Sequence, residues 1–234
     1  TTSAVEASAV ATGTGGFAIY GAPSFSNLGY SVSSAGDVNG DGLDDLIMIR
    51  GKLDAFYDSG AEIAVMYGNS GTSTWNSAFT NALFGGIAFN SNNTAAIDST
   101  GFRITGFESA LSLKTGDHGN AGLAQMGGDV NRDGLADILV STATGITYDT
   151  TASKTGNEFF VVYGKTGGGT VNINNIKTGN GQGMYIHYGT NSNNGFLGDI
   201  ASAGDFNGDG YDDFMVNNGS THESWLIYGK SGGT

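Results

Sequence analysis

The sequence predicts an all-β protein made of tandem units, each with four short antiparallel strands. Short apolar runs recur along the 234 residues, and the same order of runs returns three times. The chain also contains 41 Gly and a single Pro. Together with the recurring apolar runs, this composition indicates many tight turns between strands rather than disorder.

The most informative motif is a nine-residue acidic segment that occurs at 37–45, 129–137 and 205–213 and reads D-x-N-x-D-G-x-x-D. Side-chain oxygens recur at positions 1, 3, 5 and 9, and the Gly at position 6 permits a sharp turn. Such a set suits Ca²⁺, which takes about six to eight oxygen ligands at about 2.3–2.6 Å. The backbone carbonyl of position 7 would complete the set, which leaves its side chain free to be apolar.

These loops predict about three Ca²⁺ ions per chain. The predicted ligands are Asp37, Asn39, Asp41, Leu43 and Asp45 in the first loop, Asp129, Asn131, Asp133, Leu135 and Asp137 in the second, and Asp205, Asn207, Asp209, Tyr211 and Asp213 in the third.

Two other interpretations of the loops are an EF-hand and a metal-free turn. An EF-hand loop closes with Glu at position 12 between helices. Here an Asp at position 9 closes the loop, and the apolar runs that follow, 46–49, 138–140 and 214–216, are typical of buried strands. Turns are also rich in Asn, Asp and Gly, but they need neither alternating carboxylates nor the ninth-position Asp.

The other strands of each unit are placed around the loop. Strands of small residues precede the loops at 29–36, 122–128 and 198–204, third strands are expected at 62–68, 158–164 and 224–229, and last strands at 16–21, 101–106 and 183–189. Tandem four-stranded units are typical of a β-propeller. We therefore predict an N-terminal arm or linker at 1–15 and a propeller domain of three blades at 16–234, in which the strand at 16–21 completes a blade begun elsewhere.

Propellers contain about four to eight blades. Three blades per chain therefore predict either a homodimer that completes a six-bladed ring or one part of a longer array. The sequence begins with the last strand of one unit, at 16–21, and ends after the third strand of another. This shifted phase favours the homodimer, because the first strand can complete the last blade of a ring.

The loops resemble those of the FG-GAP repeat family, the calcium-loop propeller repeats also found in the head of integrin α-subunits. The resemblance rests on Gly36-Asp37-Val38-Asn39-Gly40-Asp41-Gly42 and its two counterparts, on the Phe-Arg-Ile-Thr-Gly strand at 102–106, and on the Tyr-Gly-Lys-Ser/Thr-Gly turns. It implies a β-propeller in which Ca²⁺ stiffens the rim of the blades and takes no part in catalysis.

Charge excludes several partners. Asp and Glu number 22 against 9 Lys and Arg, for a formal net charge of −13, so nucleic acids and anionic membrane surfaces would repel the chain. No apolar run approaches the length of a membrane span. The absence of Cys excludes disulfides, thiolate metal sites and thiol nucleophiles.

No catalytic constellation is predicted. His118, His187 and His222 stand at non-equivalent places of the repeat, and the Gly-Lys-Thr and Gly-Lys-Ser turns at 164–166 and 229–231 lack the leading Gly of a phosphate loop. The acid pairs 44–45 and 212–213 resemble glycosidase carboxylates only superficially, because neighbouring residues of a strand point to opposite faces.

The sequence therefore predicts a non-enzymatic module that is secreted or displayed at the cell surface, since extracellular Ca²⁺ modules bind at about 10⁻⁴–10⁻³ M. Its expected role is adhesion through a protein or glycan ligand, bound by the long loops at 50–60, 72–100 and 145–156. The alternatives are a self-assembling block of a surface layer or large adhesin, and an accessory domain of a hydrolase.

Overall fold

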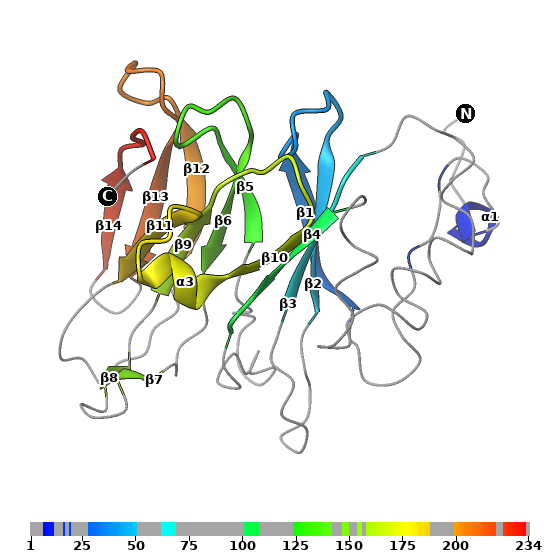
Figure 1. Cartoon of the computed structure of the whole chain (residues 1–234), viewed down its shortest axis with the longest axis horizontal. Coiled ribbons are helices and arrows are strands. Elements are labelled where there is room, and N and C mark those ends of the chain that lie inside the picture. Colours follow the sequence, from blue (N-terminus) through cyan, green and yellow to red (C-terminus); the bar gives the residue numbers. More distant parts are fainter. Residues whose placement is uncertain are drawn as a thin grey trace.

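The computed structural model describes residues 7–11, 16, 19, 28–50, 62–68, 101–107, 124–141, 147–149, 154–155, 158–187, 199–218 and 222–232. This part of the chain is almost entirely β-structure (Figure 1). Twelve strands form three main sheets of five, four and three strands, and β7 (Thr147–Asp149) and β8 (Lys154–Thr155) form a separate small hairpin. Two five-residue helices, α1 (Ala7–Ala11) and α3 (Ile173–Lys177), complete the described elements.

The first sheet begins as an antiparallel meander in chain order and then gains a distant strand. Its strands are β1 (Leu28–Gly36), β2 (Asp45–Arg50), β3 (Glu62–Met66), β4 (Gly101–Thr105) and β10 (Gly169–Asn172). Neighbours from β1 to β4 pair antiparallel, whereas β10 pairs parallel with β4.

The second and third sheets repeat the antiparallel order. The second contains β5 (Ala124–Gly128), β6 (Asp137–Ser141), β9 (Glu158–Val162) and β11 (Gly183–His187), and the third contains β12 (Ile200–Gly204), β13 (Asp213–Asn218) and β14 (Glu223–Ile227). No sheet closes on itself within the described residues.

Two apolar cores lie between consecutive sheets. Ile47 of β2 belongs to the core shared with Ile138 of β6, and Leu139 of β6 belongs to the next core with Phe214 of β13. Consecutive residues of β6 are thus buried on opposite faces, because the second sheet is covered on both sides. This double burial explains why the strand sequence is an unbroken apolar run rather than an alternating one.

The strands predicted in all three units are confirmed to within two residues at most ends wherever the structure describes them. Most of the predicted strand at 16–21 and of the loops at 50–60 and 72–100 lies outside the described residues. The predicted arm at 1–15 contains α1, and the segment β10–α3 was not predicted.

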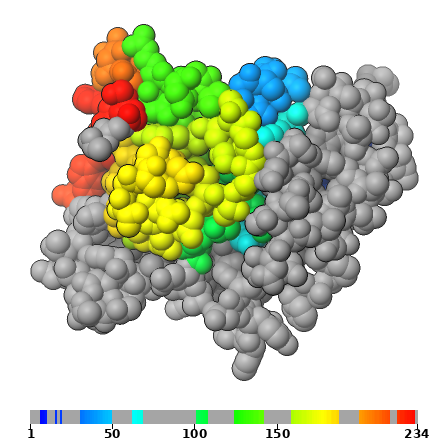
Figure 2. Space-filling model, in the orientation of Figure 1, coloured from blue at the N-terminus to red at the C-terminus, as the bar shows by residue number. Residues whose placement is uncertain are grey.

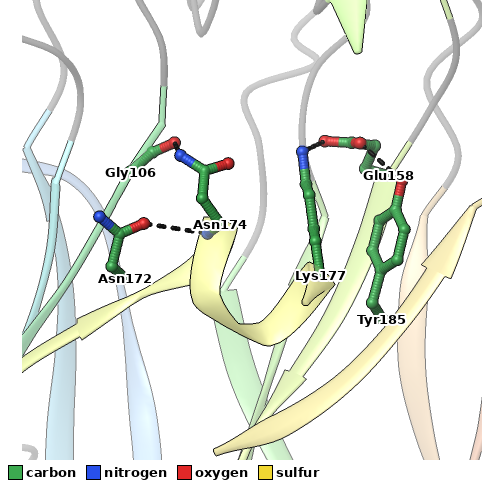
Figure 3. Close-up of polar contacts among 6 residues, drawn as sticks. All are labelled: Gly106, Glu158, Asn172, Asn174, Lys177 and Tyr185. Carbon is green, nitrogen blue, oxygen red and sulfur yellow. Dashed lines mark hydrogen bonds and ion pairs between the residues drawn. The ribbon is translucent and has the colours of Figure 1, made fainter. Parts of the chain in front are cut away.

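The β10–α3 segment links the first two sheets. Asn172 ends β10 and caps α3, because its side-chain oxygen accepts the N–H of Asn174 at 2.9 Å. The Asn174 side chain in turn donates to the Gly106 carbonyl, just beyond β4, at 3.2 Å (Figure 3). The chain thus leaves the second sheet, adds a strand to the first, and returns through α3 to β11.

The far end of α3 is anchored to the second sheet by a buried carboxylate. Glu158 of β9 is fully buried and accepts the Lys177 ammonium at 2.8 Å and the Tyr185 hydroxyl at 2.7 Å (Figure 3). Lys177 also lies 5.6 Å from the centroid of the Tyr185 ring. A buried charge that is both paired and hydrogen-bonded is tolerated, so this cluster fixes α3 without exposing the core.

Candidate metal loops

The first residue of each acidic loop organises its backbone. The Asp37 carboxylate accepts the N–H groups of Gly40, Asp41 and Gly42 at 2.7, 3.0 and 2.8 Å. Asp205 accepts the corresponding three groups, and Asp129 accepts those of positions 5 and 6. Gly at position 6 has φ of 85°, 90° and 90° in the three loops, a conformation that favours glycine.

Positions 3 and 5 continue the same network. The Asn39 side-chain oxygen accepts the N–H of Asp41 at 2.9 Å, the Asn39 amide donates to the Asp41 carboxylate at 3.0 Å, and that carboxylate accepts the N–H of Leu43 at 2.9 Å. The other two loops repeat these bonds. The structure therefore brings positions 1, 3 and 5 together in one turn, three times over.

Position 9 has a different environment. Asp45, Asp137 and Asp213 are each fully buried. One oxygen of Asp137 accepts the N–H of Val130 at position 2 of the loop, and the other accepts the N–H of Gly164 beyond β9, both at 2.9 Å. Asp45 and Asp213 make the equivalent pair of bonds.

The ninth-position carboxylate thus ties its loop to the third strand of the sheet. The motif alone did not indicate this role. The signal in the sequence was the Tyr-Gly pair that follows each third strand, since its Gly supplies the second N–H.

Burial and neighbouring charge both act on the position-9 carboxylates. Burial raises the pKa of Asp137 to about 7, and the charges of Asp133 and Asp129 add to the effect, against the N–H bonds from Gly164 and Val130. Burial likewise raises the pKa of Asp45, with Asp41 and Asp37 contributing. The acids of a loop therefore repel one another, and a bound cation would relieve this repulsion.

The donors of each loop fit a hard cation in kind, because they are all carboxylate, amide or carbonyl oxygens. Among the residues that the structure describes, no three side chains of Asp, Glu or His are grouped so as to hold a metal ion. A carboxylate oxygen that accepts one N–H retains a further lone pair for a metal.

The loops also join neighbouring sheets. The carbonyls of Asp37 and Val38 accept the N–H groups of Ala136 and Lys165 at 2.9 and 2.8 Å. One repeat later, the carbonyls of Asp129 and Val130 accept those of Asp212 and Lys230 at 3.1 and 3.0 Å. The three loops consequently lie in a row along one edge of the molecule (Figure 1).

Among the described residues, the other candidate groups do not converge. His187 ends β11 and His222 precedes β14, in different sheets, while His118 lies outside the described residues. The Lys165 ammonium donates to the nearby Gly168 carbonyl at 2.5 Å. In the second acid pair, the Asp212 carboxylate accepts the N–H of Asp129 at 2.7 Å.

Repeated antiparallel sheets with a hydrogen-bonded acidic loop at the same edge define a repeat protein of the β-propeller-like class. The sequence of the chain matches the family model of the FG-GAP repeat at residues 28–54 and 197–227. Two segments of the chain therefore match the FG-GAP repeat, which confirms the resemblance of the first and third loops. The middle loop, between the two matched segments, repeats their hydrogen bonds.

FG-GAP repeats are typical of extracellular, integrin-like β-propeller domains. No curated protein matches the chain. In the described part of the chain, neither helix has the length and apolar character needed to cross a membrane.

Proposed function

We propose that this chain is a non-enzymatic, calcium-binding, extracellular β-propeller module that mediates adhesion by binding a protein or glycan. The observation that carries the proposal is the threefold recurrence of one loop geometry, with oxygen donors at positions 1, 3 and 5 joined by the same hydrogen bonds. The FG-GAP match supports the extracellular propeller class.

Calcium would be held by the residues at positions 1, 3, 5, 7 and 9 of each loop, and it would supply positive charge rather than chemistry. Three divalent ions would reduce the formal net charge from −13 to −7. Because the loop carbonyls accept hydrogen bonds from the next sheet, fixing the loops would also fix the angle between neighbouring sheets.

The proposed architecture treats the three main sheets as propeller blades of four antiparallel strands. The third sheet has three strands among the described residues, and a strand at 16–21 would complete a blade. Two chains would then form a ring of six blades.

The second candidate is a self-assembling block of a surface layer or a large adhesin. It is favoured by apolar side chains that the third sheet exposes, Phe206 and Tyr228. The two candidates differ in whether the assembled chain has a saturable foreign ligand.

Calcium binding is tested by calorimetry and by Tb³⁺ luminescence. About three ions should bind, with dissociation constants near 10⁻⁴–10⁻³ M, and Tyr211 in the third loop should sensitise bound Tb³⁺. Tyr211→Leu is the matched control, because the other loops have Leu at this position. It should reduce the luminescence without changing the number of Ca²⁺ ions bound. Failure to bind Ca²⁺ at about 10 mM contradicts the proposal.

Adhesion is tested with beads that carry the chain on surfaces coated with a glycan panel or with serum proteins. Retention in millimolar Ca²⁺ that is lost in chelator supports an adhesive role. No retention in either condition argues for the structural alternative, whereas equal retention in both shows binding that does not depend on Ca²⁺.

A further inference from the structure

We call the contact between two consecutive sheets a junction. The two junctions in the described part of the chain show which residues a complete junction buries. At both junctions the residue at loop position 2 is a fully buried Val, Val38 or Val130. Its counterpart in the third loop, Phe206, is 70% exposed. The Tyr that follows the third strand behaves in the same way, since Tyr67 is 7% exposed and Tyr228 is 55% exposed.

Two more positions of the third sheet lack their cover. Met215 of β13 is exposed, whereas its counterparts Ile47 and Leu139 are buried. Gly128, before the second loop, lies against the Asp212 side chain, but a Cβ built on Gly204 would meet nothing within 4 Å. We call Gly204, Phe206, Met215 and Tyr228 the trailing face. The third sheet lies at one end of the molecule, in orange and red (Figure 2).

The first sheet has the complementary set of exposed apolar residues, on the side that does not face the second sheet. Val32 of β1 is 67% exposed, although its counterparts Ala124 and Ile200 are buried. Leu46 of β2 is exposed as well, whereas its counterpart Ile138 is fully buried. Of the six large apolar side chains that are exposed in the described part, five belong to these two faces, and Met126 is the sixth.

The first repeat also carries counterparts of the polar groups that form a junction. At the second junction Asp212 donates its N–H to the Asp129 carbonyl and accepts the Asp129 N–H. Asp44 is the counterpart of Asp212 in the first repeat, and it is exposed. A Cβ built on Gly164 or Gly229 would meet the position-2 carbonyl of the preceding loop, whereas the three atoms nearest a Cβ on Gly68 belong to its own repeat. We call Val32, Asp44, Leu46 and Gly68 the leading face.

We propose that the trailing face of one chain binds the leading face of a second copy, and that the contact reproduces the two internal junctions. In this contact Asp44 would donate its N–H to the Asp205 carbonyl and accept the Asp205 N–H, while Phe206 would be covered. The internal junctions are the argument for a second copy as the occupant, because the two faces are the two halves of the same junction.

The contact is centred on the loop ends of the two sheets. Further from the loop, Met48, Ala64 and Met66 of the first sheet are already buried, so they add no free surface. If each chain spans half a turn, two such contacts close a twofold symmetric ring. This inference specifies the interface of the ring in the proposed function, although it does not depend on calcium binding.

The test is the mass of the full chain by analytical ultracentrifugation in millimolar Ca²⁺, over a range of concentrations. The wild-type chain should form a dimer. Phe206→Ser should raise the dissociation constant at least about tenfold, because Ser cannot bury the apolar surface that Phe206 would bury in the contact. Phe206→Val should retain the dimer, because Val occupies this position at both internal junctions. Ser is chosen over Asp so that no charge is added beside the loop.

Met126→Ser is the control for loss of an exposed apolar side chain outside both faces, since Ser34 and Ser202 are its counterparts. It should leave the dimer unchanged. Leu46→Ser, on the leading face, should weaken the dimer as well, because its counterparts Ile138 and Phe214 are fully buried. A wild-type monomer at all concentrations, or equal weakening by Phe206→Ser and Met126→Ser, overturns the interface.

Counting bound Ca²⁺ on the same samples separates the two proposals. A monomer that binds three ions overturns the interface and leaves the calcium proposal standing. A dimer that binds none supports the interface and overturns calcium binding.

Discussion

Replacing Asp137 by Asn should destabilise the middle repeat whether or not calcium is present. Both oxygens of this buried carboxylate accept backbone N–H groups, from Val130 and Gly164, at 2.9 Å. An Asn side chain offers only one oxygen, and its NH₂ group would face the other N–H. One buried donor is therefore left without a partner, at a cost of about 1–3 kcal/mol, and the remaining bond loses its charge.

Removing the carboxylate also has a favourable effect. Burial of this charge, and its repulsion by Asp133 and Asp129, disfavour the ionised form, so a neutral side chain recovers part of the loss. We expect a net decrease of about 2–4 kcal/mol in the free energy of unfolding. For a chain of this length, that corresponds to a fall in Tm of roughly 4–16 °C.

The assay is thermal unfolding followed by circular dichroism, in chelator and again in millimolar Ca²⁺. The paired variant is Asp133→Ala, which removes an exposed carboxylate from the same loop. In chelator it should cost less than about 1 kcal/mol, and its larger effect should appear only with Ca²⁺. Equal losses for both variants in chelator, or no loss for Asp137→Asn, would refute the structural role given to position 9.

Three further substitutions test other contacts by the same unfolding assay. Tyr67→Phe removes a hydroxyl whose one hydrogen is shared between two carbonyls of the next repeat, and it should cost about 1–2 kcal/mol. Tyr228→Phe, at the exposed counterpart, should cost nothing measurable in the monomer. Burial raises the pKa of Tyr67 to about 12, so the stability that its protonated hydroxyl contributes should persist below pH 10 and be lost as the pH rises towards 12. The titration is followed by the difference in tyrosinate absorbance between wild type and Tyr67→Phe. A normal tyrosine titration in this difference would contradict the prediction. Lys177→Met leaves the buried Glu158 carboxylate without its cation and should cost about 2–4 kcal/mol, partly restored by adding Glu158→Gln; no restoration argues against the ion pair. Gly128→Ala places a Cβ against a carboxylate at a φ of 80° and should cost more than about 1 kcal/mol, so an unchanged Tm contradicts the close approach.

The strands and loops could be predicted because each has a local signal. A buried run such as 138–140 is apolar at every position, and the loop at 129–137 carries its turn residues and acids in fixed order. The position-9 acids could be singled out for the same reason. Their second partner could not, because Gly164 lies just beyond β9, 27 residues further along the chain.

The segment β10–α3 had no comparable signal. β10 contains four residues, two of them Gly and Thr, and its parallel pairing with β4 depends on a strand more than 60 residues earlier. The five-residue helix α3 is too short to show a helical period. Both elements are held by tertiary contacts such as that between Lys177 and Glu158, which a local pattern does not record.

The β10 strand has a mechanical consequence. A force that separates the first two sheets must break the parallel β4–β10 ladder, the Asn174–Gly106 bond and the apolar core at the same time. No described strand crosses from the third sheet to the second, so they are held by their core and by hydrogen bonds such as those at the loops. Under tension the third sheet should therefore detach first, while the first two separate only at higher load. A module of this kind would unfold in steps. Its weakest interface would be determined by where β10 crosses between sheets rather than by the strength of any one contact.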